Sequence, residues 1–309
     1  MENKYYSNGK LLLTGEYAVL DGALSLAVPT IYGQSLAVKE IDLPKLIWKS
    51  RDEKGRVWFD HEFDIKQFSP NVGAVHFKSP DPILQTLYKI LTEAQKLNPT
   101  FLRGPKGYEV MAELDFPKNW GLGTSSTLIN NIAQWAKVDP YKLLWGSFGG
   151  SGYDIACAQH GTSVLYRLKN GRPSVQEIGF DPLFKSNLFF VYLNKKQNSG
   201  DGILNYRKRN FDKTKLVVGI SKITTAILAC TDLSDFEALL TDHENLISST
   251  LKLPTVRERY FSGYPGAIKS LGAWGGDFIL ATGNGDTLDY FHTKGYKIVI
   301  PYEKMVLSP

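Results

Sequence analysis

Four short segments of this 309-residue sequence combine glycines with side chains that can hold a phosphate or move a proton. The most informative one, residues 121–126, lies between a stretch of alternating apolar residues and a helical apolar pattern. Glycines allow the backbone to approach an anion closely, and the N–H groups of a helix's first turn point at that anion. Ser125 and Ser126 could bind a phosphate or hold Mg²⁺, whereas the alternative interpretation is a tight turn with serine caps. The segment consists of Gly121, Leu122, Gly123, Thr124, Ser125 and Ser126.

This glycine-rich loop differs from two common nucleotide-binding sequences. In a Walker sequence, Gly-Lys-Ser/Thr follows four residues after a glycine, and the loop contains no such lysine. A dinucleotide-binding fingerprint has three glycines and opens a βαβ unit with an acidic residue downstream. Here the third glycine is missing, and the preceding strand comes late in the chain. Neither pattern therefore describes the loop.

The second segment, residues 8–22, contains a lysine and a glutamate that could contact a ligand. Lys10 opens an apolar strand, where an unpaired ammonium group would be costly if it were buried. A lysine at the start of a strand is also commonly just solvated. Glu16 lies beside a glycine turn and is either a surface residue or a partner for a ligand hydroxyl.

The remaining two segments add a carboxylate and a second glycine-rich loop. Asp154 follows Gly-Gly-Ser-Gly-Tyr and begins a helical apolar pattern, so one interpretation is an acid that stabilises the helix N-terminus. The functional alternative is a general base that takes the proton of an attacking hydroxyl. Residues 269–277, taken alone, indicate a loop before an edge strand.

The apolar periodicity predicts a mixture of strands and helices without internal repeats. A polar basic loop is expected after the strand that ends at residue 194. A change of composition near residues 181–187 predicts a boundary between domains 1–182 and 183–309. Strands are expected over 10–14, 24–41, 56–64, 108–116, 187–194 and 277–281, helices over 81–97, from 125, over 213–229 and 233–251 and near 265–270, and a helix and strand within 286–300.

The composition is that of a soluble globular protein, with 43% hydrophobic and 22% charged residues. The N-terminus lacks a basic segment followed by an apolar one, and no run approaches ~20 apolar residues, so we expect neither a signal peptide nor a membrane partner. The net charge of +5 comes without a basic stripe interleaved with aromatic residues, which argues against nucleic-acid binding. We expect a cytoplasmic protein that binds a small molecule, with a homodimer left open.

The order and spacing of the four segments resemble the GHMP kinase superfamily, named for galactokinase, homoserine kinase, mevalonate kinase and phosphomevalonate kinase. Residues 9–17 are similar to its first motif, residues 121–127 to its Gly-Leu-Gly-Ser-Ser-Ala phosphate loop, and residues 272–276 to its Gly-Ala-Gly-Gly-Gly loop. The aspartate of the family's Ser-Gly-x-Asp segment falls on Asp154. The resemblance covers nearly the whole chain and is closest to phosphomevalonate kinases, because Gly-Glu-Tyr stands at 15–17 where mevalonate kinases usually have Gly-Glu-His.

The resemblance implies an α+β GHMP kinase fold, with an N-terminal ribosomal protein S5 domain 2-like domain, a C-terminal ferredoxin-like domain, and ATP and acceptor between them. It also implies an ATP- and Mg²⁺-dependent kinase. In that family picture residues 121–126 cradle the triphosphate and Ser126 contacts the metal. Lys10 stabilises the developing charge on the acceptor hydroxyl, and Asp154 takes its proton. The acceptor contacts that we assign within this picture are Glu16, Lys195, Lys196, Lys269 and Gly272.

Three departures from the family pattern bear on the function. Asn8 stands where the family has a proline, and Thr127 stands where it has an alanine. In mevalonate kinase-like members a glutamate upstream of the catalytic aspartate helps to hold Mg²⁺, and residues 139–150 of this sequence contain no glutamate. We expect phosphomevalonate, in isoprenoid precursor synthesis, as the acceptor. The alternatives are a mevalonate kinase, a sugar or polyol kinase, and a catalytically inactive sensor of the same fold. The basic loop that begins at Lys195 would meet a phosphate on the acceptor or close over ATP, or it is plain solvated structure.

Overall fold

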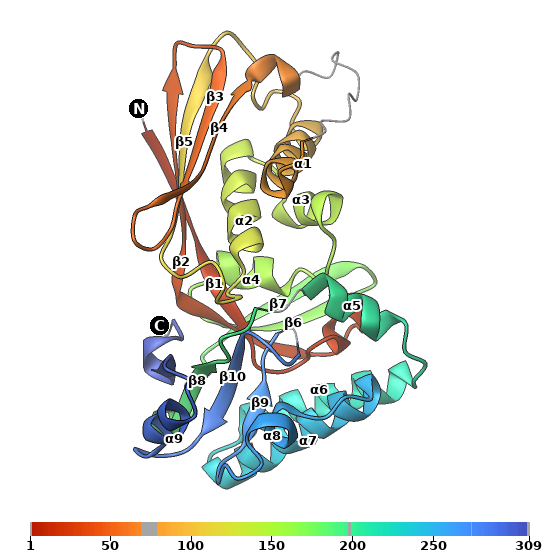
Figure 1. The fold of residues 1–309 in the computed structure, drawn as a ribbon. Helices are drawn as coiled ribbons and strands as arrows, with labels where there is room; N and C mark the ends of the chain where they lie inside the picture. The colour runs from red at the N-terminus through yellow and green to blue at the C-terminus, as the bar shows by residue number, and fades with distance from the viewer. Residues whose placement is uncertain (1, 69–78, 197–198, 273, 308–309) are drawn as a thin grey trace. The chain divides into compact units, whose positions relative to one another are not determined.

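The computed structural model describes residues 2–68, 79–196, 199–272 and 274–307. By its contacts the chain forms two compact units that interleave along the sequence (Figure 1). The first unit contains Met1–Gly9, Tyr32–Lys118 and Gly123–Gln159, and the second contains Lys10–Ile31, Asn119–Leu122 and His160–Pro309. The predicted division into 1–182 and 183–309 stays a prediction, because these compact units do not meet at one boundary.

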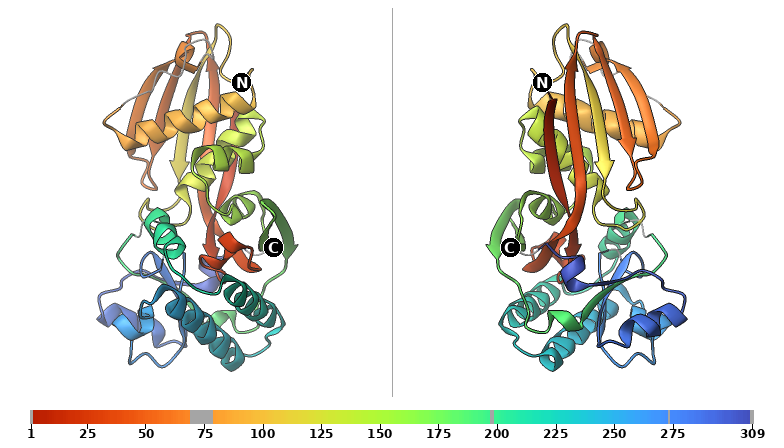
Figure 2. Two further views of the ribbon diagram at one scale, coloured as in Figure 1. Left: turned by 90° about the vertical axis from the view of Figure 1, so that its right-hand side faces the viewer. Right: turned by 90° about the vertical axis from the view of Figure 1, so that its left-hand side faces the viewer.

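The first unit is a layer of helices on a mixed sheet. Its strands follow the order β4-β3-β5-β2, with β3 and β5 parallel and the other two pairs antiparallel. Alternate side chains of these strands are buried, such as Leu36, Val38, Leu46, Trp48 and Val110, and each contributes about 2 kcal/mol by leaving water. Figure 2 shows the helices of this unit on one face of the sheet. The elements are β1 (Glu2–Leu12), which pairs with β2 (Ser25–Ile41), β3 (Lys45–Arg51), β4 (Val57–Asp64), a 3₁₀ turn (Ile65–Phe68), α1 (Pro82–Leu97), β5 (Gly107–Leu114), α2 (Thr124–Ala136), α3 (Pro140–Ser147) and α4 (Tyr153–Gln159).

Local sequence signals explain where these helices begin. Asp81 accepts a hydrogen bond from the N–H of Ile83, and Pro82 occupies the first helical turn, where its missing N–H costs nothing. Asp139 caps α3 in the same way, again directly before a proline. The helix predicted over 81–97 is therefore confirmed.

The second unit contains an antiparallel four-stranded sheet in the order β11-β8-β10-β9. Its long helices α6 and α7 pack against each other, and the start of β2 pairs with a β6–β7 hairpin. None of the described helices is long and apolar enough to cross a membrane. The elements are a 3₁₀ turn (Ala18–Asp21), β6 (Ser163–Lys169), β7 (Arg172–Ile178), a 3₁₀ turn (Lys185–Asn187), β8 (Leu188–Tyr192), α5 (Ser199–Arg207), α6 (Lys213–Ala229), α7 (Leu233–Leu251), α8 (Val256–Tyr260), β9 (Ile268–Ser270), β10 (Phe278–Thr282), α9 (Thr287–Thr293), β11 (Val299–Pro301) and a 3₁₀ turn (Tyr302–Lys304).

Two predicted elements of this unit are wrong. The short helix expected near 265–270 is strand β9, which pairs with β10 through Ile279↔Ser270 and is too short for its apolar pattern to distinguish helix from strand. The basic loop expected after residue 194 contains helix α5. The apolar residues of this helix show little 3.6-residue periodicity, so the sequence pattern did not predict it. The predicted α+β class is confirmed.

Candidate active site

The N-terminus of α2 has the features of an anion site. Gly123 caps this helix with a φ of 94°, a left-handed conformation that favours glycine, and no side chain caps the first turn. The Ser125 side chain is exposed, whereas that of Ser126 is buried. The N–H groups of this turn and the positive end of the helix dipole can therefore meet a phosphate, as the sequence predicts.

Ser126 is joined to Asp154 within the first unit. The Ser126 hydroxyl donates a hydrogen bond to the Asp154 carboxylate, 28 residues further along the chain. Asp154 lies in the first turn of α4, which follows three glycines with positive φ, Gly149, Gly150 and Gly152. The structure thus brings together the predicted metal contact and the predicted general base, a pairing that the sequence alone did not indicate.

The oxygens of Ser126 and Asp154 fit part of a magnesium site. Mg²⁺ is bound in proteins by one or two carboxylates, together with phosphate oxygens and waters. Among the described residues, no group of three or more His, Cys, Asp or Glu side chains is arranged to hold a metal. The donor set therefore fits Mg²⁺ that arrives with a triphosphate, rather than a metal held by protein ligands alone.

Lys10 is bound to the first half of the glycine-rich loop, within the second unit. Its Nζ donates to the carbonyl oxygen of Gly121 at 3.0 Å, and its backbone N–H donates to the carbonyl oxygen of Leu122 at 3.0 Å. The Leu122 side chain is fully buried and anchors this end of the loop. The predicted catalytic lysine and the predicted phosphate loop are therefore in direct contact.

Asp277 is a site residue that was not predicted from the sequence. A Cβ atom on Gly121 would lie 2.5 Å from Oδ2 of Asp277, so only glycine fits beside this carboxylate. The Asp277 N–H donates to the carbonyl oxygen of Lys195 at 2.7 Å. Asp277, which ends the second glycine-rich loop, consequently contacts both Gly121 and Lys195 within the second unit. Lys195 is the first residue of the basic segment, by which we mean the basic stretch from Lys195 to Arg209. The signal that could have found Asp277 is the Gly-Gly-Asp sequence at 275–277.

The predicted acceptor contacts Glu16 and Lys269 bind each other. Lys269 is completely buried, and its Nζ lies 2.7 Å from Oε1 of Glu16, which is also buried. Among the described residues, no donor makes a well-oriented hydrogen bond to either Glu16 oxygen, so the contact with Lys269 is mainly electrostatic. Burial raises the pKa of Glu16 to about 7, opposed by the charge of Lys269. The pairing explains both residues without a ligand, and their predicted contact with the acceptor remains a prediction.

Two residues from α7 complete this buried cluster and carry no sequence motif. The Nε2 atom of His243 accepts the Gly15 N–H at 2.9 Å and lies 3.3 Å from Oε2 of Glu16. Burial and the charge of Lys269 hold the pKa of His243 well below its ordinary value, so the ring is neutral. Burial raises the pKa of Glu244, whose Oε1 lies 3.6 Å from Lys269 Nζ.

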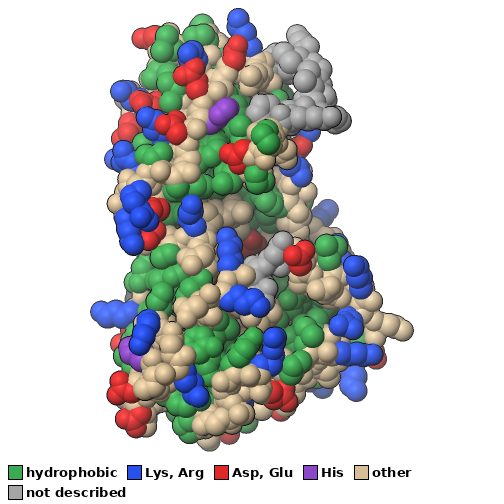
Figure 3. Space-filling model, viewed as in Figure 1, with side chains coloured by type: hydrophobic (Ala, Val, Ile, Leu, Met, Phe, Trp, Pro, Cys, Tyr) green, Lys and Arg blue, Asp and Glu red, His purple; other side chains and the backbone are tan. Residues whose placement is uncertain are grey.

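The remaining predicted acceptor contacts are two lysines and a glycine of the second unit. Lys195 and Lys196 are exposed. Gly272 has a φ of 68°, which favours glycine. In Figure 3 basic side chains gather over α5 and the start of α6, where Arg207, Lys208, Arg209, Lys213 and Lys215 are exposed.

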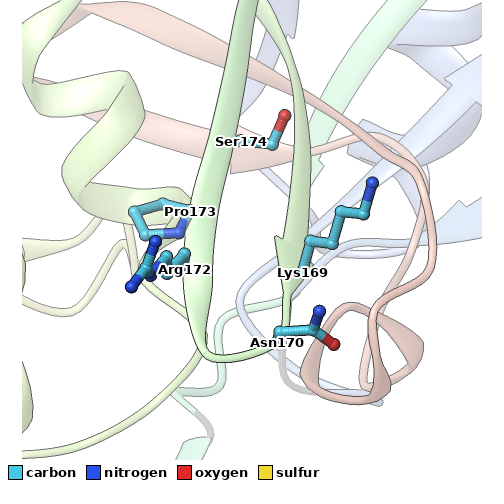
Figure 4. Close-up of a pocket in the computed structure, with 5 residues that line it drawn as sticks. All are labelled: Lys169, Asn170, Arg172, Pro173 and Ser174. Carbon is cyan, nitrogen blue, oxygen red and sulfur yellow. The ribbon is translucent and has the colours of Figure 1, made fainter.

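A hollow of about 510 Å³ lies elsewhere in the second unit, at the β6–β7 turn (Figure 4). All of its lining residues come from this one hairpin, and none is a predicted site residue. It therefore contributes nothing to the candidate active site. Its lining residues are Lys169, Asn170, Arg172, Pro173 and Ser174.

The comparisons with known proteins identify the fold. No family model matches the sequence, and no curated protein matches it. Among solved structures, the match to L. major mevalonate kinase in complex with R-mevalonate covers 99% of this chain and 96% of that chain, with 16% sequence identity and a TM-score of 0.69. The match to Streptococcus pneumoniae phosphomevalonate kinase in complex with phosphomevalonate and AMPPNP covers 94% of this chain and 95% of that chain, with 15% identity and a TM-score of 0.66. The match to Lactococcus lactis galactokinase complexed with galactose covers 99% of this chain and 94% of that chain, with 12% identity and a TM-score of 0.69. The fold is therefore that of the GHMP kinases, as the sequence motifs predict.

Proposed function

We propose that this chain is an ATP-dependent phosphotransferase of the GHMP kinase type, acting on a hydroxyl group of a small polar metabolite. The observation that carries the proposal is the hydrogen bond from Ser126 to Asp154 at the N-terminus of α2. Phosphoryl transfer asks a protein mainly to position the reactants and to stabilise charge. The N-terminus of α2 can bind phosphate, and the paired hydroxyl and carboxylate can position a metal and accept a proton. The fold that this chain shares with two kinases also supports a phosphotransferase.

Each predicted residue has a defined task in this reaction. Magnesium ATP, when bound, supplies the phosphoryl group and neutralises part of its charge. Asp154 accepts the proton of the acceptor hydroxyl, and Ser126 fixes the orientation of the carboxylate until then. Lys10, held by the Gly121 carbonyl, stabilises the negative charge that develops on the acceptor oxygen. The first turn of α2 binds phosphate oxygens through its N–H groups.

The acceptor that we propose is phosphomevalonate, followed by mevalonate. A phosphorylated acceptor carries a dianion, and lysines form strong charge-assisted hydrogen bonds with phosphate. Lys195 and Lys196 are exposed, and the Lys195 backbone is bonded to Asp277 beside Gly121. The neighbours include a phosphomevalonate kinase solved with phosphomevalonate and a mevalonate kinase solved with R-mevalonate, so both acceptors agree with the fold, and the order rests on the two lysines. Galactokinase and a heptose 1-phosphate kinase share the fold, so sugars belong among the acceptors to be tested.

An acceptor panel tests the proposal. The purified chain is incubated with Mg²⁺ and ATP and, separately, with phosphomevalonate, mevalonate, homoserine, galactose and a heptose phosphate, and the phosphorylated product is measured directly. We expect product from phosphomevalonate above all others. Product from a sugar alone would overturn the acceptor but not the kinase. Binding of ATP without product from any acceptor would instead favour an inactive sensor of the same fold.

A further inference from the structure

Helix α7 places two buried side chains, His243 and Glu244, against two different segments of the second unit. His243 accepts the backbone N–H of Gly15, in the turn that carries Glu16. Glu244 accepts hydrogen bonds from the Ser270 hydroxyl at 2.9 Å and from Nε1 of Trp274 at 3.3 Å. Neighbouring residues of one helix therefore hold the first motif on one side and the second glycine-rich loop on the other.

Two further contacts connect these segments directly. Lys269 lies between two carboxylates, 2.7 Å from Glu16 and 3.6 Å from Glu244. The backbone N–H of Trp274 donates to the Tyr17 hydroxyl at 3.1 Å. Since all these charged groups are buried, removing one partner leaves the others uncompensated, which is costly. The turn at 15–17 is consequently tied to Lys269, Ser270 and Trp274 through charge and hydrogen bonds.

We propose that His243 and Glu244 are positioning residues that fix the turn at 15–17 to the second glycine-rich loop. This loop leads into Asp277, which packs on Gly121, and the Gly121 carbonyl in turn accepts the Lys10 ammonium. A shift of the loop therefore reaches the partner of Lys10. For its kinetic test the inference rests on the proposed kinase function, whereas its structural test does not.

The structural test uses the full chain labelled with 5-fluorotryptophan. Six tryptophans give six fluorine resonances, and the resonance that is missing in Trp274→Phe belongs to Trp274. Glu244→Gln removes the charge that faces Lys269, and we expect it to shift the Trp274 resonance more than the other five. Asp242→Asn, an exposed neighbour on α7, is the charge-matched control and should shift none of them.

A second variant keeps the test valid if Glu244→Gln does not fold. Tyr17→Phe removes only the hydroxyl that accepts the Trp274 N–H and keeps the ring, which stacks on Tyr206 with centroids 5.4 Å apart. It should also shift the Trp274 resonance.

The kinetic test measures product formation in both variants. We expect kcat to fall about tenfold or more, with KM for ATP within about twofold of wild type, because misplaced groups slow the reaction without removing the ATP site.

The outcomes separate this inference from the proposed function. An unmoved Trp274 resonance in both variants would overturn the inference. A shifted resonance with wild-type kcat would overturn it too, because the anchoring would then serve only the fold. If the wild type turns over no acceptor, the proposed function fails while the resonance still decides whether Glu244 holds the loop.

Discussion

The hydroxyl of Ser126 donates a hydrogen bond to the carboxylate of Asp154, so two predicted functional residues on different helices contact each other within the first unit. Ser126 is the predicted magnesium contact, and Asp154 is the predicted base. We therefore expect a variant at either position to disturb the other side chain as well. This coupling decides how the kinetics of the variants must be compared.

Ser126→Ala should raise the Mg²⁺ concentration needed for half-maximal activity by about tenfold or more, as is typical when a group that orients a metal ligand is lost. The physical reason is that Asp154 loses the hydrogen bond that orients it. Ser125→Ala should have a smaller effect, because its side chain is exposed, whereas the buried Ser126 hydroxyl is the one that donates to Asp154. A titration of activity against Mg²⁺ checks both. Unchanged Mg²⁺ and ATP dependence in both single variants and in the double variant would remove both serines from the proposed Mg²⁺-ATP site.

Lys10→Met should lower kcat by about a hundredfold or more, because the charge that stabilises the acceptor oxygen is gone. The lost bond to the Gly121 carbonyl should lower the free energy of unfolding by only about 1 kcal/mol, since the group is partly exposed. Steady-state kinetics and chemical denaturation measure the two effects. Lys4→Met, an exposed lysine on the same strand, is the control and should change neither. A Lys10→Met enzyme with wild-type kcat would remove Lys10 from the mechanism.

Glu16→Gln should remove one contribution to the free energy of unfolding, a contribution that decreases as the pH rises from about 4.5 to 7. Burial raises the pKa of Glu16 from 4.5 to about 7 in the folded chain. A raised pKa means that the folded state holds the proton more tightly, so this group's contribution to stability is present below pH 4.5 and is lost as the pH rises to about 7. His243, whose pKa is lowered, acts in the opposite direction, losing stability as the pH falls below 6.5 in both proteins.

The measurement is chemical denaturation of wild type and Glu16→Gln across this pH range. The stability of the variant relative to wild type should rise with pH up to about 7 and then level off. A difference that is constant with pH would show that Glu16 titrates normally in the folded protein.

Much of the first unit could be predicted from the sequence. Asp81 and Pro82 mark the start of α1, and the alternation of apolar residues marks β5, because capping and strand periodicity are local effects. The glycine-rich loop before α2 was predicted for the same reason. These features depend on residues that are near one another in the chain.

The contacts between distant residues could not be predicted. Nothing local distinguishes Lys269 from a solvated lysine, and only the fold shows that it lies 2.7 Å from Glu16. Glu244 and His243 belong to no motif and look like ordinary residues of an amphipathic helix. The position of Asp277 against Gly121 depends likewise on how β10 meets the segment 119–122. Burial of charge is a tertiary property, so a sequence pattern cannot reveal it.

Replacing Lys195 and Lys196 together with alanine should raise KM for a phosphorylated acceptor about tenfold and leave KM for ATP nearly unchanged. Charge-assisted hydrogen bonds to the acceptor's phosphate are lost, and because both lysines are exposed the two contacts together contribute about 1.4 kcal/mol, which corresponds to a tenfold change. The matched control replaces Lys208 and Arg209 together with alanine, which removes two exposed cations at the other end of the basic segment. If both double variants behave alike, or if the wild type phosphorylates mevalonate and ignores phosphomevalonate, the basic segment is not an acceptor site.

The most direct test of the central claim is the rate of phosphoryl transfer from ATP to the preferred acceptor in wild type and in Asp154→Asn, with ATP binding measured in parallel. The amide cannot take the acceptor's proton, so we predict intact ATP binding and a kcat lowered roughly 10²–10⁴-fold. Asp242→Asn, with the same change at an exposed position, should match wild type. An Asp154→Asn enzyme that transfers the phosphoryl group at nearly the wild-type rate would contradict the account.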